Sequence, residues 1–324
     1  MQLNLTLDIP PLPSPITYTD KVLLIGSCFT EHMSDRLSQH KFTVLSNPNG
    51  ILFNPLSVSL SLNSYLDRKM YTEQDLFHLN ELWNSWDHHT RFSHINREEA
   101  LHGINNSQLE AYFFIKQANW VMITLGSAYQ YYLQAVQRPV ANNHRAPAQW
   151  FDKKLLTTDD IVTVLSGTLA KLFEINPSVQ VMFTISPVRH IRDGVINNNR
   201  SKARLIDAAH TLCERFSNTH YFPAYELLID ILRDYRYYDI DFVHPNYMAT
   251  SYVWEQFVKS CIAPDTQKIM QEVKEVVTAR AHRPRFPQTE GHSKFKAGYV
   301  QKVTDLLNRY PYLDLNEELK YFSS

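Results

Sequence analysis

The chain has 324 residues, of which 44 % are hydrophobic and 20 % are charged, a composition typical of a globular protein rather than a disordered one. Its 32 basic and 33 acidic residues give a formal net charge of −1, which argues against a general nucleic-acid binder. No apolar run approaches the ~18 residues that span a bilayer, the N-terminus carries no signal segment, and three scattered cysteines exclude a disulfide framework. We therefore expect a cytoplasmic protein with no nucleic-acid or membrane partner.

Four short apolar runs, each ended by a polar turn, organise the first 260 residues. They span 21–25, 42–45, 120–125 and 179–185. Between them, apolar residues recur at helical spacing over 161–172, 205–216 and 225–235. Runs that are apolar throughout suit strands buried on both faces, and their alternation with helices predicts an α/β fold around a parallel sheet.

The remaining segments divide the chain into two parts. A long stretch rich in Leu, Trp and His, residues 57–118, predicts a mostly helical insertion. The chain beyond residue 260 predicts a charged helix, a loop-like linker and a final helix before an amphipathic tail, over 268–280, 281–296 and roughly 297–309. We therefore expect a core domain of residues 1–260 and a helical C-terminal extension of residues 261–324.

The carboxyl ends of parallel strands meet at one edge of a sheet, where folds of this kind bind their ligands. We expect the polar loops after the four apolar runs to converge there on one crevice. The chain has only 8 glycines, against roughly 23 at the ~7 % of average usage. Four of them, Gly26, Gly50, Gly126 and Gly194, lie beside the segments that carry the candidate chemistry.

The first candidate segment is residues 22–29, an apolar run that turns at Gly26-Ser27 and enters a helix. A serine at this turn has its hydroxyl at the sheet edge and its amide near a helix N-terminus, which suits a nucleophile whose own amide helps to bind an oxyanion. The alternative is that Ser27 only caps the helix. Cys28 is a second candidate nucleophile, although a thiol beside an apolar Phe29 is more often buried.

The second candidate segment, residues 239–246, contains Asp241 and His244 just before a helical stretch. Their spacing of three lets the carboxylate orient the imidazole on a turn, as general-base catalysis requires. By itself such a turn is more often structural, so its interpretation depends on the Gly-Ser turn.

Histidine-rich residues 86–94 allow three interpretations: a metal cluster, the lining of a substrate pocket, or an ordinary polar loop. Adjacent histidines diverge on a regular backbone, which disfavours the metal. His190 follows the fourth apolar run on the expected active face, where it either contacts substrate or braces the crevice with Arg189. Three tyrosines after Gly126 either line a sugar-binding lip or pack in the core, namely Tyr129, Tyr131 and Tyr132.

Together, the early Gly-Ser turn and the late Asp-x-x-His-Pro segment resemble the layout of SGNH/GDSL-type hydrolases. Residues 26–30, Gly-Ser-Cys-Phe-Thr, look like the signature of the GSCFA family, with Thr30 where the family name has Ala. Further segments also look similar to this family: 47–50, 53–55, 124–127, 186–190, 193–194, 201–203, 221–226, 233–237 and 244–245. The resemblance spans residues 20–260, and the C-terminal extension shows none.

This resemblance implies a three-layer α/β/α sandwich with a mostly parallel central sheet. It implies Ser27 as nucleophile, His244 as general base and Asp241 as its orienting partner, without a cofactor or a metal. The oxyanion would be held by the Ser27 amide, by a glycine amide after the second strand, for which Gly50 is the candidate, and by an asparagine side chain after the third.

The third oxyanion donor departs from the Gly-x-Asn pattern of these hydrolases, because the chain reads Gly126-Ser127-Ala128. The donor must then come from Ser127 or Asn54, or be absent. Loss of one such donor costs ~10²–10³ in rate, so weak activity or a different acyl-group chemistry is an open alternative.

The resemblance favours a serine esterase that acts on small acyl esters, and O-acetyl groups on carbohydrates are one candidate substrate. An acyltransferase on the same residues, with a hydroxyl acceptor in place of water, is the first alternative. The second is a non-catalytic binding protein whose hydrolase site has degenerated, as the missing asparagine suggests.

Overall fold

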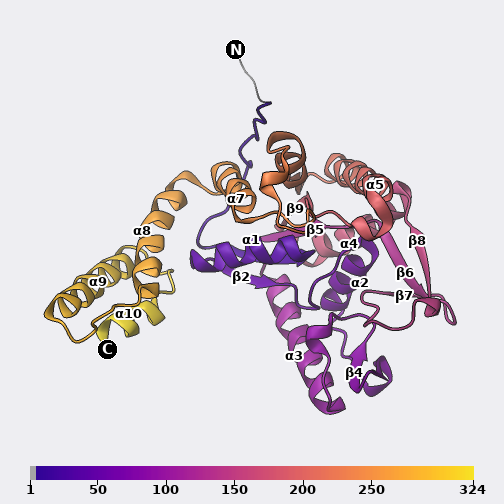
Figure 1. Ribbon diagram of the computed structural model, residues 1–324, viewed down its shortest axis with the longest axis horizontal. Helices are drawn as coiled ribbons and strands as arrows, with labels where there is room; N and C mark the ends of the chain where they lie inside the picture. Colours follow the sequence, from indigo (N-terminus) through magenta and orange to yellow (C-terminus); the bar gives the residue numbers. More distant parts are fainter. Residues whose placement is uncertain (1–4) are drawn as a thin grey trace.

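The computed structural model describes residues 5–324, and its centre is a parallel β-sheet (Figure 1). The five strands are β1 (Lys21–Gly26), β2 (Thr43–Ser46), β5 (Trp120–Leu125), β9 (Gln180–Ile185) and β10 (Thr219–Tyr221). They lie in the order β10-β9-β5-β1-β2, and every neighbouring pair is parallel. The predicted sheet is confirmed. β10 was not predicted, because its three residues, Thr-His-Tyr, are too few and too polar to form an apolar run.

Successive residues of β1 point to opposite faces of the sheet, and both faces are buried. Val22 and Leu24 pack in one apolar cluster with α1 (Cys28–Gln39) and α7 (Tyr247–Cys261). Leu23 and Ile25 pack in a second cluster with the helices of the other face. Those helices are α2 (Pro55–Leu66), α3 (Arg97–Ile115), α4 (Thr158–Ile175) and α5 (Gly194–Arg215). The three-layer α/β/α sandwich is therefore confirmed.

The insertion between β2 and β5 is less helical than predicted. Between α2 and α3 lies a hairpin of two short strands, β3 (Leu76–Leu79) and β4 (Leu82–Ser85). A second small sheet follows β5 and consists of β6 (Tyr129–Leu133), β7 (Arg138–Val140) and β8 (Phe151–Leu155) in the order β7-β6-β8. These strands are half-exposed and mix aromatic with charged residues, so no continuous apolar run reveals them.

The predicted helix over 225–235 is interrupted. A short helix, α6 (Ala224–Glu226), widens into a π-type turn over 227–231, where the Leu232 N–H donates to the Leu227 carbonyl at 3.0 Å. This widening ends the regular helical path early, and the chain continues through a single turn into the segment before α7.

Three further helices lie to one side of the sandwich (Figure 1). They are α8 (Pro264–Ala281), α9 (Glu290–Arg309) and α10 (Asn316–Ser323). The final long helix begins at Glu290 instead of near residue 297, because the Thr289 side chain caps it by accepting a hydrogen bond from the His292 N–H.

A buried carboxylate joins these helices to the sandwich. The side chain of Glu318 is 1 % exposed, and its Oε1 accepts from Lys41 Nζ and from Arg280 Nη1, each at 2.8 Å. Lys41 lies between α1 and β2, whereas Arg280 lies near the end of α8. The apolar cluster of α1 and α7 continues into the same helices, so the extension packs on the α1 side of the sheet.

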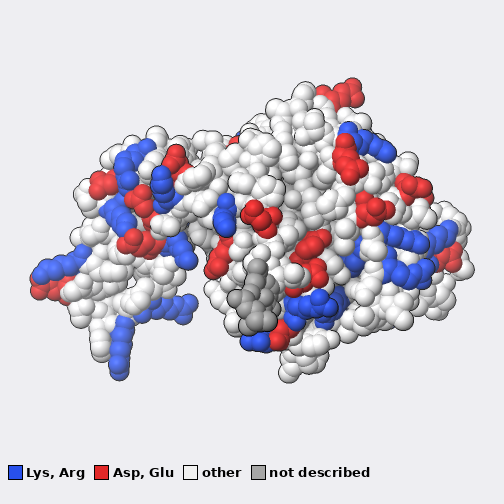
Figure 2. All heavy atoms as spheres, turned by 90° about the horizontal axis from the view of Figure 1, so that it is seen from above, with Lys and Arg blue, Asp and Glu red and all other residues white. Residues whose placement is uncertain are grey.

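Basic and acidic side chains lie next to one another over the face shown in Figure 2, in keeping with the net charge of −1. Within residues 5–324, no helix is both long enough and apolar enough to cross a membrane.

Candidate active site

Ser27 lies at the carboxyl edge of the sheet, between the end of β1 and the start of α1. Its backbone is extended, with φ −71° and ψ 176°, and it occupies the N-cap position of the helix without forming a side-chain cap hydrogen bond. The side chain is fully buried, and Oγ has no hydrogen-bond partner among residues 5–324. Buried hydroxyl groups are nearly always paired, so an orphaned one indicates a role other than capping.

Gly26 sets this position, because no other residue fits there. Its φ is +143°, and a Cβ on it would lie 2.1 Å from the Thr124 carbonyl oxygen of β5. Its N–H donates to Asn47 Oδ1 at 2.8 Å, in the turn that follows β2. The residue before Ser27 is thereby fixed between two neighbouring strands, which gives the serine a defined place.

His190 lies beside Ser27 across Gly126. A Cβ on Gly126 would lie 3.3 Å from Ser27 Cβ and 3.2 Å from His190 Nε2. The His190 Nε2 atom is buried and has no hydrogen-bond partner in the described part of the chain. Burial, together with the nearby Lys202 ammonium, lowers the pKa of His190 to about 4, so the imidazole is neutral at pH 7. Two unpaired polar atoms therefore flank one glycine.

Asp241 and His244 form a hydrogen-bonded pair on the turn before α7. His244 Nδ1 lies 2.6 Å from Asp241 Oδ2, and Asp241 Oδ1 accepts from the N–H groups of Val243 and His244 at 2.9 and 3.0 Å. The His244 side chain and then these amides lower the pKa of Asp241 to about 2. Both side chains are close to half exposed, and the geometry leaves His244 Nε2 unbonded among residues 5–324.

The structure brings Ser27 together with His190, but it does not join Ser27 to His244 by a hydrogen bond. The loop after β9 nevertheless holds the two histidines in one region. The Arg189 N–H donates to the Val243 carbonyl at 3.2 Å, and the Arg189 guanidinium lies 4.2 Å from the centre of the Tyr238 ring. Arg189 thus braces the turn of His244, and its neighbour His190 faces Ser27.

The two amides expected to bind an oxyanion already have acceptors in the structure. The Ser27 N–H donates to the Thr124 carbonyl at 3.1 Å, because the close approach at Gly26 brings β1 against β5. The Gly50 N–H donates to the Asn47 carbonyl at 2.6 Å and closes the turn after β2. Gly50 itself lies against His89, since a Cβ on Gly50 would lie 2.2 Å from His89 Cβ.

The amides after β5 are engaged in the same way. The N–H groups of Gly126 and Ser127 both donate to the Phe53 carbonyl, at 2.8 and 2.9 Å. Asn54 caps α2 by accepting from the Ser57 N–H at 2.8 Å, and its Nδ2 has no acceptor in the part of the chain that the structure describes. Asn54 Nδ2, His190 Nε2 and the buried Asn47 Nδ2 are therefore side-chain donors without an acceptor among residues 5–324.

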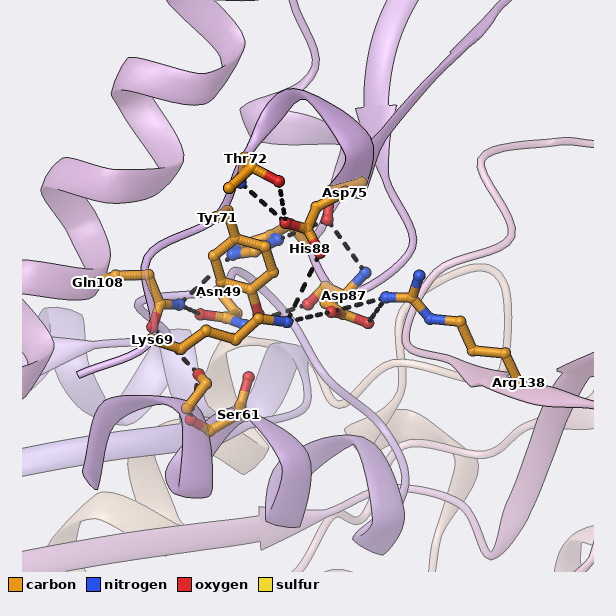
Figure 3. A network of polar contacts seen from close by, with 12 residues as sticks. Asn49, Ser61, Lys69, Tyr71, Thr72, Asp75, Asp87, His88, Gln108 and Arg138 are labelled. Atoms are coloured by element: carbon orange, nitrogen blue, oxygen red, sulfur yellow. Dashed lines mark hydrogen bonds and ion pairs between the residues drawn. The ribbon is translucent and has the colours of Figure 1, made fainter. Parts of the chain in front are cut away.

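The histidine-rich segment 86–94 packs against the turn that contains Gly50. Figure 3 shows Asp87 between Lys69 and Arg138, and Arg138 Nη2 donates to both Asp87 oxygens at 2.9 Å. Asn49 Nδ2 donates to the Asp87 carbonyl, and Asn49 Oδ1 accepts from Gln108 Nε2. A cavity of about 620 Å³ adjoins this network. Within residues 5–324, no three His, Cys, Asp or Glu side chains are grouped to hold a metal ion.

The three tyrosines after Gly126 lie on the small sheet rather than in the core. Tyr129, Tyr131 and Tyr132 belong to β6 and are partly exposed. The ammonium of Lys153, on β8, lies 4.5 and 5.2 Å from the ring centres of Tyr129 and Tyr131. Tyr131 packs against a small apolar cluster that contains Trp86 and Val140, and its ring contacts Phe151 edge-on, which supports the packing alternative for this residue. The sugar-binding lip stays a prediction.

A model of the GSCFA family matches residues 21–257. The chain belongs to the GSCFA family. A second model, of the C-terminal domain of GSCFA domain proteins, matches residues 273–324. The C-terminal extension, which showed no resemblance in the sequence, is thus a recognised part of GSCFA proteins.

The GSCFA chain has no match among functionally curated proteins. Among solved structures it is similar to an acetyl xylan esterase, Est2A, from the rumen bacterium Butyrivibrio proteoclasticus, with a TM-score of 0.38 and 10 % sequence identity. The alignment covers 76 % of the GSCFA chain and 64 % of the esterase.

One buried residue of the GSCFA site escaped the sequence analysis. Lys202 belongs to segment 201–203, which resembles the family, but no role was predicted for it. Its side chain is buried at the carboxyl edge of the sheet. Its helical spacing to Leu205 and Ala209 on the buried face of α5 was the signal that could have revealed it.

Proposed function

We propose that this GSCFA protein is a serine hydrolase of the SGNH type, which cleaves small acyl esters through a covalent intermediate on Ser27. The observation that supports it most directly is the buried, unpaired Ser27 Oγ at a strand-to-helix turn, next to the unpaired His190 Nε2. The Asp241–His244 pair on a neighbouring turn supplies an oriented base.

In the proposed reaction, Asp241 accepts a hydrogen bond from the His244 Nδ1–H, which holds the tautomer whose Nε2 is free to accept a proton. As Ser27 Oγ attacks the ester carbonyl carbon, His244 Nε2 takes the hydroxyl proton. The tetrahedral intermediate then expels the alcohol, which receives that proton from His244. A water molecule, deprotonated by the same imidazole, attacks the acyl-serine, releases the acid and restores Ser27.

This sequence requires the His244 turn to approach Ser27, because the two side chains share no hydrogen bond in the structure. No helix or named strand covers residues 239–244, most of which are exposed, but the segment is closed by a β-bridge between Tyr238 and Pro245 and by the hydrogen bond from the Asp239 N–H to the His244 carbonyl. Tightening of catalytic hydrogen bonds upon substrate binding is common in enzymes.

The developing oxyanion would be bound by side chains rather than by the amides that bond to other carbonyls. Asn54 Nδ2 and His190 Nε2 are two of the unpaired donors among residues 5–324, and Asn47 Nδ2, beside Gly26, is a third. A neutral imidazole can donate to an oxyanion without the loss of a proton, and the low pKa of His190 keeps it neutral. These donors would replace the asparagine that the sequence lacks at Ala128.

The space above Ser27 favours a small acyl group. Phe53 Cδ1, His190 Nε2 and Ser27 Cβ all lie within 3.4 Å of the position that a Cβ on Gly126 would occupy. Such close surroundings favour an acyl group as small as acetyl, and O-acetyl carbohydrates remain the proposed substrate class. Hydrolysis and transfer to a sugar hydroxyl would begin with the same acyl-serine.

A binding protein with a degenerate hydrolase site is the second candidate. It is favoured by the engaged amides of Ser27 and Gly50 and by the missing bond between Ser27 and His244.

Hydrolysis of p-nitrophenyl acetate separates the two candidates. The esterase proposal predicts turnover that is lost in Ser27→Ala and falls ~10⁴-fold in Asp241→Asn, as in other Ser-His-Asp enzymes. Asp239→Asn, which changes a carboxylate of the same turn outside the pair, is the matched control. Turnover equal in wild type and Ser27→Ala, or none at all in folded protein, would favour the binding protein.

A further inference from the structure

A lysine is buried at the carboxyl edge of the sheet without a counterion. Lys202, in α5, is 1 % exposed, and its Nζ donates to the Gly126 carbonyl at 2.7 Å and to the Ser186 carbonyl at 2.6 Å. Gly126 and Ser186 are the first residues after β5 and β9, which are neighbours in the sheet. The ammonium therefore joins the ends of two adjacent strands.

The charge of Lys202 is balanced only by dipoles. No carboxylate within residues 5–324 forms an ion pair with it. The titratable groups that face it are the Cys28 thiol from α1, the His190 imidazole from the loop after β9 and the Tyr225 ring of α6, whose centre is 5.9 Å away. Burial lowers the pKa of Lys202 to about 7, while the Cys28 thiolate would raise it.

An unpaired buried cation is costly, so its presence calls for a compensating role. Gly126 links Lys202 to the reacting groups: its carbonyl binds the ammonium, and its Cα faces Ser27 and His190. The single residue Gly126 therefore separates the positive charge of Lys202 from Ser27 and His190, beside which an ester oxygen would become negative. Charges held in a buried site act strongly on such an oxygen, because water does not screen them.

We propose that Lys202 is a positioning residue of this site, which fixes the ends of β5 and β9 and stabilises by its charge the anion that develops beside Ser27. The inference rests on the proposed function. It adds a charged residue to a site in which Ala128 occupies the position of the asparagine expected as the third oxyanion donor.

The role has a pH signature. His244 must be neutral to accept the proton of Ser27. Lys202 must be protonated to stabilise the anion, so the rate falls as pH rises through its own lowered pKa. Lys202→Arg keeps the positive charge at all accessible pH values, whereas Lys202→Met removes it from a side chain of similar length.

The test is the rate constant for fluorophosphonate labelling of Ser27 in the full chain, measured between pH 5 and 10. We expect Lys202→Met to label at least tenfold more slowly than wild type at pH 7, and Lys202→Arg to label without the alkaline decline. Lys171→Met, which removes a partly exposed lysine of α4 that pairs with Asp67, is the matched control and should label like wild type. Wild-type rates in Lys202→Met, or the same alkaline decline in Lys202→Arg, would overturn the inference.

A second readout does not depend on esterase chemistry. Burial raises the pKa of the Cys28 thiol, and the Lys202 charge is one of the groups that lower it. Lys202→Met should therefore slow alkylation of Cys28 by iodoacetamide at pH 6.5, where Lys202 is still charged, as followed by peptide mapping, and unchanged alkylation at this pH would contradict a charged Lys202. Wild-type protein that does not label at Ser27 would overturn the proposed function together with this role, whereas labelled wild type with unaffected Lys202→Met overturns the inference alone.

Discussion

Ser27 Oγ and His190 Nε2 are both buried, neither has a hydrogen-bond partner among residues 5–324, and both side chains lie against Gly126. This arrangement depends on the absence of a side chain there, since a Cβ on Gly126 would lie 3.3 Å from Ser27 Cβ and 3.2 Å from His190 Nε2. Two buried polar atoms without hydrogen bonds destabilise the folded protein, and hydrogen bonds to a bound substrate oxygen would offset that loss. This relationship links the fold to the proposed chemistry.

Gly126→Ala should reduce activity while the protein stays folded. The added methyl group would enter the space between Ser27 and His190 and displace the acyl group, so we expect kcat/KM for p-nitrophenyl acetate to fall at least tenfold. Gly167→Ala is the matched control, because a Cβ on this glycine of α4 meets nothing within 4 Å. It should keep full activity and gain about 0.5–1 kcal/mol of stability, as Gly to Ala does in helices. Equal activity in Gly126→Ala and wild type would contradict the proposed place of the substrate.

His190→Leu should slow acylation by about 10²–10³-fold, the cost of one oxyanion donor. His190→Gln should recover part of the rate, because its amide also donates a hydrogen bond. Single-turnover kinetics with p-nitrophenyl acetate measure this step. If the glutamine and leucine variants are equally slow, His190 does not act as a donor.

Acid should destabilise the folded protein partly through His88, which is fully buried with a pKa lowered to about 3, chiefly by burial. The unfolded chain binds a proton at an ordinary histidine pKa of about 6.5, so the stabilising contribution is complete above that pH and is lost as pH falls toward 3. Between pH 6.5 and 5 the loss is about 2 kcal/mol.

Urea unfolding at these two pH values provides the measurement. We expect His88→Gln to show a decrease in unfolding free energy that is smaller than in wild type by about 2 kcal/mol. His102→Gln changes an exposed histidine of α3 and should decline as wild type does. A His88→Gln decline as steep as that of wild type would show that His88 titrates normally.

Glu318→Ala should weaken the attachment of the C-terminal helices. It removes the buried partner of Lys41 and Arg280, and loss of one member of a buried ion pair costs about 3–5 kcal/mol. Glu317→Ala removes a neighbouring carboxylate that is 70 % exposed and should cost less than about 1 kcal/mol. Differential scanning calorimetry of both variants measures the difference, and similar losses in the two would refute the assignment.

The sequence predicts the sheet and the place of Ser27 because both depend on local patterns. A buried parallel strand is an uninterrupted apolar run, and a Gly-Ser break at its end marks the crevice. The Asp241–His244 hydrogen bond likewise follows from a spacing of three on one turn.

The hydrogen-bonding state of the amides could not be predicted, because it depends on contacts between distant strands. The Ser27 N–H meets Thr124 of β5, and the Gly126 N–H meets Phe53, whose backbone runs into α2. The small β6–β8 sheet has half-exposed strands without a strong apolar pattern. Lys202 looks like an ordinary charged residue until its burial between two carbonyls is seen.

The central claim, that Ser27 is a nucleophile activated by His244, is tested most directly by labelling purified protein with a fluorophosphonate and locating the adduct by intact mass and peptide mapping. We predict a single adduct on Ser27 that is absent in Ser27→Ala and abolished in His244→Ala. Folded wild-type protein that forms no adduct, or an adduct on Ser27 that forms equally fast in His244→Ala, would contradict the account.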